Sequence, residues 1–195
     1  MELMTSRQVQ AEQTKAQIVN AVGDLMMEKD IRDLKIREIC GKVGISVGTF
    51  YLYFTCKEAA LLYSYRTADM VFEDLDLSGS VESCVRRVLR THLELISEES
   101  LKIVKQIYIC HLTYYDDYFF SEDRPFFVAL NSQIARLMDG RGAQETKDIT
   151  WKLLNMSRGF IFNLCIRKDI DIPSWRERKL EELMSYLRFL LYKTE

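Results

Sequence analysis

The 195-residue sequence contains only eight glycines and two prolines. Both residues interrupt regular elements, so their scarcity predicts long helices with short connections. No run of about 18 apolar residues occurs, and a membrane span is therefore not expected. The first ten residues lack the basic and then apolar pattern of a secretory signal. We expect a cytoplasmic protein.

Cysteine and histidine are sparse too, and neither forms a cluster. The five cysteines are Cys40, Cys56, Cys84, Cys110 and Cys165, with no CxxC pair among them. Scattered thiols in a cytosolic chain are typical of buried small hydrophobes or free thiols, and a redox sensor is the alternative interpretation. His92 and His111 stand alone. Because no nucleophile–base pair, glycine-rich phosphate loop or metal-ligand spacing appears, we expect no metal, no cofactor and no enzymatic activity.

Charge of one sign is also lacking, since the formal net charge is −2. Residues 1–66 contain nine Lys and Arg against eight Asp and Glu, whereas residues 67–195 contain 18 against 21. The N-terminal part is thus only slightly positive. Any binding to nucleic acid must come from a local surface and not from bulk charge.

Helical periodicity runs through the whole chain. Residues 14–29 repeat apolar side chains at three- and four-residue spacing, which is typical of an amphipathic helix. Further helices are expected over residues 35–44, 46–54, 56–77, 81–97, 101–114, 125–138, 144–168 and 174–192. No paired strands or sequence repeats are found, so the sequence predicts an all-α fold of about nine helices.

Residues 34–57, LKIREICGKVGISVGTFYLYFTCK, have the pattern of a helix-turn-helix. The first helix can end at Gly44 in a left-handed conformation, and Ser46 can cap the second helix. Phe50 and Phe54, four residues apart, can anchor the second helix to the first helix through Ile39 and Val43. This pattern places the second helix in the position of a recognition helix.

The opposite face of that helix carries the candidate DNA contacts. Small residues allow close approach to the major groove, Thr49 can contact a base edge or a thymine methyl, and tyrosine hydroxyls can bind phosphates. The alternative interpretation is that the tyrosines are surface aromatics of a helical hairpin and that Arg37 is an ordinary solvated charge. For Lys15, contact with a flanking phosphate and an ordinary surface position are equally open. The candidate DNA-binding residues are Lys35, Arg37, Ser46, Val47, Gly48, Thr49, Tyr51, Tyr53 and Lys57.

The segment resembles the signature of the tetracycline-repressor (TetR) family over about residues 10–66. The shared letters are IREI from Ile36, GIS from Gly44, GTFY from Gly48, YF from Tyr53, and KE from Lys57 with a later leucine. Two positions depart from the family pattern. A threonine is usual where this chain has Leu34-Lys35, and a serine is usual at the position of Cys56, whose thiol is a weak helix cap.

The resemblance implies two domains: a helix-turn-helix in residues 1–57, with residues 57–77 as a connecting helix, and a ligand-binding and dimerisation domain in residues 78–195. It implies a repressor that a small-molecule effector releases from a palindromic, double-stranded operator. The alternative is a DNA-bound structural protein with no effector. Residues 144–168 are apolar on more than one side, which independently favours a homodimer. The candidate interface residues are Met156, Gly159, Phe160, Leu183, Leu187 and Leu190.

An effector pocket is expected among aromatic and polar residues of the middle helices. Arg158 lies among apolar neighbours, and such an arginine needs an anionic partner, either an effector carboxylate or an internal Asp or Glu. The aromatic residues are either core or a ligand cage. The candidates are His92, Tyr108, His111, Tyr115, Phe119, Phe120, Phe126, Phe127, Trp151, Asn155, Arg158 and Asn163.

Overall fold

A computed structural model describes residues 5–139 and 142–192 of the chain, and every regular element in those ranges is helical. The all-α expectation of about nine helices is confirmed there. The elements are α1 (Ser6–Met26), α2 (Ile36–Val43), α3 (Val47–Tyr53), α4 (Lys57–Asp69), η1 (Met70–Phe72), α5 (Val81–Glu94), α6 (Glu98–Thr113), η2 (Asp117–Phe120), α7 (Pro125–Leu137), α8 (Ala143–Ile166) and α9 (Ile172–Tyr192). No described helix is long and apolar enough to cross a membrane.

Two helix boundaries differ from the expectation. Helix α1 begins well before residue 14, because Thr5 and Gln8 form a capping box in which the Gln8 side chain accepts the Thr5 N–H at 2.7 Å. The apolar stripe misses this start, since residues 6–13 are mostly polar and exposed. Helix α4 ends at Asp69 and not near Leu77. Asp69 is buried, and its carboxylate accepts hydrogen bonds from a distant part of the chain.

The helices form two compact units. The N-terminal unit contains the residues up to Thr67 together with Lys102–Asp116, and the C-terminal unit contains Ala68–Leu101 together with the residues from Asp117 onward. Helices α4 and α6 therefore contribute to both. The functional division at residues 57 and 78 stays a prediction.

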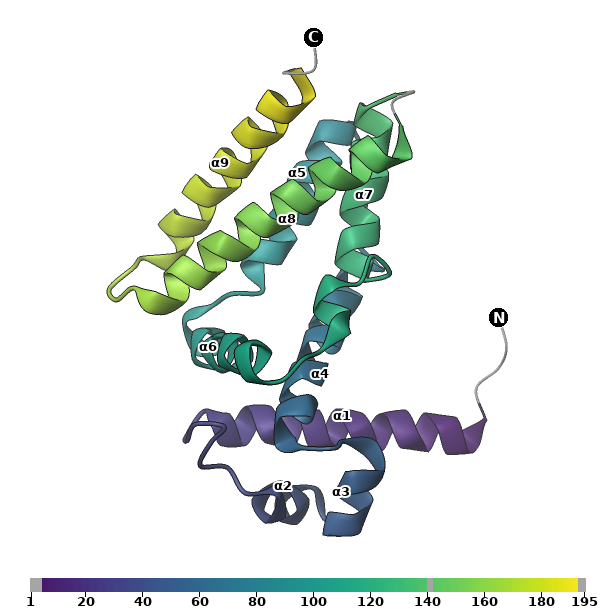
Figure 1. Cartoon of the computed structure of the whole chain (residues 1–195), viewed down its shortest axis with the longest axis vertical. Coiled ribbons are helices and arrows are strands. Elements are labelled where there is room, and N and C mark those ends of the chain that lie inside the picture. Colours follow the sequence, from purple (N-terminus) through teal and green to yellow (C-terminus); the bar gives the residue numbers. More distant parts are fainter. Residues whose placement is uncertain (1–4, 140–141, 193–195) are drawn as a thin grey trace. The chain divides into compact units, whose positions relative to one another are not determined.

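In the N-terminal unit, α1 packs on α2 and α2 packs on α3. Helices α2 and α3 lie on the same side of α1 (Figure 1). The core is apolar, with Ile18, Val22, Ile39 and Phe50 fully buried. One polar side chain joins this core from α6: Gln106 accepts the N–H of Ile31 at 3.4 Å. The helix-turn-helix therefore rests on a fixed hydrophobic base.

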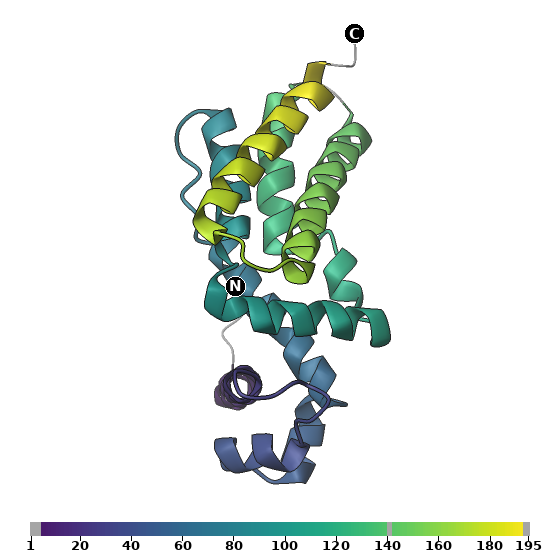
Figure 2. The same ribbon diagram turned by 90° about the vertical axis from the view of Figure 1, so that its left-hand side faces the viewer.

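In the C-terminal unit, α5, α7, α8 and α9 form a closed ring of packed pairs: α5 with α7, α7 with α8, α8 with α9, and α9 with α5. Helices α8 and α9 lie side by side (Figure 2). Leu89, Phe126, Leu130, Leu153 and Leu183 meet in the interior with no exposed surface. Ion pairs such as Arg90–Glu177, at 2.5 Å, add links between α5 and α9 at the surface.

Candidate nucleic-acid interface

The turn between α2 and α3 has the geometry that the sequence predicts. Gly44 ends α2 with φ at 77°, the left-handed region that favours glycine. The N–H groups of Gly44 and Ile45 both bond to the carbonyl of Cys40, at 2.8 and 3.1 Å. Ser46 then caps α3, since its hydroxyl accepts the N–H of Thr49 at 2.9 Å. These contacts fix the direction in which α3 leaves the turn.

The inner face of α3 is held by aromatic packing. Phe50 is fully buried and Phe54 nearly so, and their ring centres lie 6.0 Å apart. Tyr53 is half-buried and packs against the same core. The sequence placed Tyr53 on the outer face with Tyr51, whereas the ring of Tyr53 lies largely against the protein.

The outer face of α3 consists of Val47, Gly48, Tyr51 and Leu52, all exposed. Tyr51 is 54% exposed and Leu52 is 81% exposed. Leu52 is absent from the residues predicted for this face, although its spacing of four from Gly48 places both on one side of the helix. The Thr49 hydroxyl lies 2.8 Å from that of Ser46, so it takes part in the cap as well as reaching the surface.

Two candidate cations lie at the start of α2: Lys35 is its N-cap and Arg37 is in its first turn. Lys35 and Arg37 are exposed, and neither forms an ion pair within the described parts of the chain. The nearby carboxylate of Glu38 is neutralised by Lys29, whose ammonium lies 2.5 Å away. That hydrogen bond, together with one from the Lys35 N–H, lowers the pKa of Glu38. The start of α2 therefore presents positive charge to solvent.

Lys57 has a role inside the protein that the sequence does not reveal. Its ammonium donates to the carbonyl oxygens of Leu34, at 2.7 Å, and Arg32, at 3.0 Å. The side chain thus ties the start of α4 to the segment before α2. The Cys56 sulfur accepts the N–H of Ala59 at 3.4 Å, a weak cap for the same helix. A phosphate contact by Lys57 stays a prediction beside this structural role.

Among the residues proposed for an effector pocket, His92 is buried in the C-terminal unit. Its ring stacks on Phe126 with centres 4.2 Å apart, and its Nδ1 lies 2.9 Å from the hydroxyl of Ser157. Burial, followed by the charges of Arg124 and Arg158, lowers the pKa of His92 to about 3. The imidazole is therefore neutral at physiological pH.

Two more of these candidates, Trp151 and Arg158, belong to α8. The Arg158 guanidinium lies 3.9 Å from the centre of the Phe119 ring and donates to the Phe119 carbonyl oxygen. Trp151 packs on Phe127 with ring centres 5.0 Å apart and donates its indole N–H to Glu122 at 3.2 Å. These contacts give Arg158 an aromatic surrounding, and an effector carboxylate beside it stays a prediction.

The other candidates are more dispersed. Asn155 and Asn163 are exposed on α8, and Phe120 is exposed at the end of η2. Tyr108, His111 and Tyr115 belong to α6 and the residues after it, which are part of the N-terminal unit. There the His111 ring meets the edge of Tyr65 at 6.0 Å, while Tyr115 is exposed.

Sequence reasoning missed the buried ion pair of the C-terminal unit. Arg124 donates from Nε to Asp69 at 2.6 Å and from a terminal nitrogen at 2.9 Å, and both side chains are almost fully buried. The Tyr118 hydroxyl donates to the same carboxylate at 3.0 Å. The partners lie 55 positions apart, so no local pattern indicates the pair.

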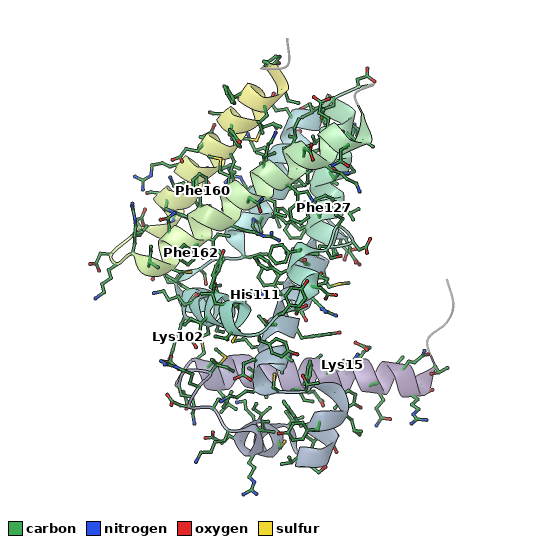
Figure 3. The ribbon with its side chains drawn as sticks, viewed as in Figure 1. Lys15, Lys102, His111, Phe127, Phe160 and Phe162 are labelled. Atoms are coloured by element: carbon green, nitrogen blue, oxygen red, sulfur yellow. The ribbon has the colours of Figure 1, made fainter. Side chains whose placement is uncertain are left out.

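The predicted dimer residues differ in their exposure. Leu183 and Leu187 are fully buried in the single chain, so they hold α9 against its own subunit and offer no surface to a partner. This corrects their assignment. Met156, Gly159, Phe160 and Leu190 are half-buried. Phe160 and Phe162 both belong to α8 (Figure 3). The large apolar side chains exposed on α8 and α9 are Phe162, Ile166, Phe189 and Tyr192.

Comparison with known proteins identifies the helix-turn-helix. Residues 15–63 match the family model of bacterial regulatory proteins of the tetR family. The helix-turn-helix part of the chain is therefore similar to the N-terminal region of that family. No curated protein sequence matches the chain.

Solved structures of TetR-family proteins share the fold over most of the chain. A TetR regulator from Rhodococcus sp. RHA1 is 15% identical with a TM-score of 0.60, covering 91% of this chain and 96% of its own. A tetR-family regulator from Streptomyces coelicolor is 16% identical with a TM-score of 0.62, covering 92% and 89%. GusR of Salmonella enterica is 17% identical with a TM-score of 0.62, covering 91% and 95%. At these identities the likeness concerns the fold.

Proposed function

We propose that this TetR-family chain is a cytoplasmic transcriptional repressor that binds a palindromic operator as a homodimer and leaves it when a small effector binds. The observation that carries the proposal is the α2–turn–α3 geometry. Its outer face is exposed and its inner face is fixed by Phe50 and Phe54. Lys35 and Arg37 add exposed cations at the N-cap and in the first turn of the neighbouring helix α2, and such cations bind the phosphates of a duplex.

A second copy of the chain is the expected partner in solution. One seven-residue helix reads only a few base pairs, and two copies add their contacts on one site. Exposed apolar side chains on α8 and α9 support this, since Ile166 is 65% exposed and Tyr192 is 79% exposed. A Cβ built at Gly159 meets no atom within 4 Å, so this position offers room for close approach of another helix.

The DNA-binding part of the proposal is tested with operator sites selected from a pool of random duplexes. Lys35→Ala and Arg37→Ala should weaken binding to all sequences alike, and each should lower the salt dependence by about one counterion. Lys168→Ala, which removes an exposed cation from the C-terminal unit, is the matched control. If no sequence is enriched over the starting pool, the chain is not a sequence-specific DNA-binding protein.

The dimer is tested by combining Gly159→Leu with Phe160→Asp, which adds bulk and a charge on α8. Sedimentation should show a monomer that keeps its helical content, and binding to a two-half-site duplex should collapse. Val128→Asp is the matched control, because Val128 is 53% exposed but lies on α7. A double variant that remains dimeric contradicts the assignment of the interface to α8 and α9.

Effector binding is tested by a thermal-shift screen of small molecules, because a ligand that binds only the folded state raises the melting temperature. A compound that stabilises the protein and releases it from DNA supports the repressor. Arg158→Met should then abolish the response to an anionic effector while DNA binding is retained. A chain that binds its operator but answers no ligand favours the alternative, a DNA-bound structural protein.

A further inference from the structure

The recognition helix α3 has an unusual composition for a base-reading element. Its seven residues, VGTFYLY, include no charged side chain and no amide. The strong bidentate readers of base edges are Arg or Lys for guanine, Asn or Gln for adenine, and Asp or Glu for cytosine. None of them is present on α3, so this helix has no means of bidentate hydrogen bonding to a base.

Apolar groups dominate the outer face of α3 instead. Leu52 is 81% exposed and Val47 is 38% exposed, beside the tyrosine ring at Tyr51. Neither aliphatic side chain belongs to the hydrophobic core of the N-terminal unit. A single exposed apolar residue is common on protein surfaces, but Val47, Tyr51 and Leu52 share the outer face of one short helix, and apolar side chains gathered on an exposed face indicate a partner that covers them.

The chemistry around this face selects double-stranded DNA as that partner. Lys35 and Arg37 lie exposed on the preceding helix and its N-cap, which suits a polyanion and not an apolar protein surface. Gly48 leaves the start of α3 without a side chain, so its backbone can approach a groove closely. In the major groove, the apolar group that a base offers is the C5 methyl of thymine.

We infer that α3 selects its operator through thymine methyl groups, with Leu52 and Val47 as the specificity-determining side chains. The inference rests on the proposed function and names the base chemistry of its ligand. Each half-site contains thymines beneath these two residues, and their methyl groups are buried on binding. Lys35 and Arg37 then bind phosphates, which position the helix without reading sequence.

The test begins with the operator selected from random duplexes and uses the full-length protein. Each thymine of a half-site is replaced, one at a time, by deoxyuridine, which removes the methyl group and keeps every base-pairing atom. Binding should weaken roughly fourfold for each buried methyl, the value expected for one methylene-sized apolar group. Deoxyuridine placed outside both half-sites is the control for changes in duplex shape, and it should leave the affinity unchanged.

Leu52→Ala assigns the effect to a side chain. Because Leu52 is 81% exposed, this variant should fold and melt like the parent protein. At the thymine under Leu52, its affinity for the thymine and deoxyuridine duplexes should become equal, while sensitivity at the thymine under Val47 persists. Val47→Ala should give the reverse pattern.

Two results overturn the inference and leave the proposed function standing. One is an enriched operator whose deoxyuridine duplexes bind as tightly as the parent duplex at every position. The other is a Leu52→Ala protein that keeps the full preference for thymine at all positions. If selection enriches no sequence at all, the proposed function fails, and the inference fails with it.

Discussion

The two compact units differ in where they keep their polar groups. Among the described residues, the buried side chains of the N-terminal unit are apolar except for Gln106. The C-terminal unit buries Asp69, His92, Arg124, Gln133, Thr146, Thr150, Ser157 and Arg158. The first unit places its candidate DNA-binding groups on the outside of an apolar scaffold, whereas the second unit buries polar and charged side chains.

This difference predicts that substitutions in the two units affect different properties, namely DNA binding in the first and stability in the second. Substitutions on the outer face of α3 remove no buried contact, so they should change binding and leave the free energy of unfolding nearly constant. A polar group buried in the C-terminal unit loses its partner when that partner is substituted, and an unpaired buried charge is costly. The predictions below test this contrast, from the largest expected effect to the smallest.

Arg124→Met should have the largest effect on stability. It leaves the buried carboxylate of Asp69 without its bidentate partner, which should cost about 3–5 kcal/mol of the free energy of unfolding. Urea denaturation followed by circular dichroism measures this loss. The double variant with Asp69→Leu removes the remaining charge and should recover a large part of it. Equal stability of the single and double variants would contradict a buried ion pair.

His92 predicts a pH dependence of stability. The folded protein holds the His92 imidazole neutral, with a pKa of about 3 against an ordinary value of 6.5. Between these two pH values the unfolded chain binds a proton that the folded chain does not, so acid favours unfolding. The stability contribution is complete above about pH 6.5 and falls toward pH 3, by roughly 1.4 kcal/mol per pH unit. Urea titrations at several pH values should therefore give a flatter dependence for His92→Gln than for the parent. Parallel curves would contradict this role.

Lys57→Met should reduce stability by a smaller amount, about 1–3 kcal/mol, the typical cost of losing hydrogen bonds made by a charged group. The carbonyls of Leu34 and Arg32 lose their shared donor in this variant. Lys35→Met is the matched control, because its side chain is exposed and should leave the melting temperature unchanged. If Lys57→Met weakens DNA binding without loss of stability, the phosphate role predicted from sequence is favoured instead.

Gly48→Ala should stabilise the protein slightly and weaken its binding to DNA. A Cβ at this position lies 3.6 Å from the Ser46 hydroxyl oxygen, an ordinary contact, and alanine favours a helix over glycine by about 1 kcal/mol. The added methyl group stands on the face that approaches the groove. Melting curves and operator titrations of the same preparation check both effects. Unchanged affinity would place Gly48 away from DNA.

Local signals explain why the N-terminal unit is the more predictable one. The left-handed Gly44, the Ser46 cap and the Phe50–Phe54 spacing act over separations of three to five positions, and the sequence shows them directly. The capping box at the start of α1 is equally local, since it spans only Thr5 to Gln8, but periodicity misses it because the residues that follow are mostly polar.

The contacts that escaped prediction are non-local. Asp69 meets Arg124 across 55 positions, and His92 meets Ser157 across 65. Helical periodicity specifies which face of a helix is buried, but it does not specify which buried polar groups meet. It likewise assigned Leu187 to a partner subunit, because an apolar stripe is the same whether its own chain or another covers it.

The central claim, that two copies of this chain read two half-sites through α3, is tested most directly by stoichiometry on DNA. Sedimentation of the protein with a labelled duplex carrying the selected operator should give two chains per duplex. A duplex with one half-site scrambled should bind far more weakly at the same salt concentration. One chain per duplex, or equal affinity for the intact and scrambled duplexes, would contradict the account.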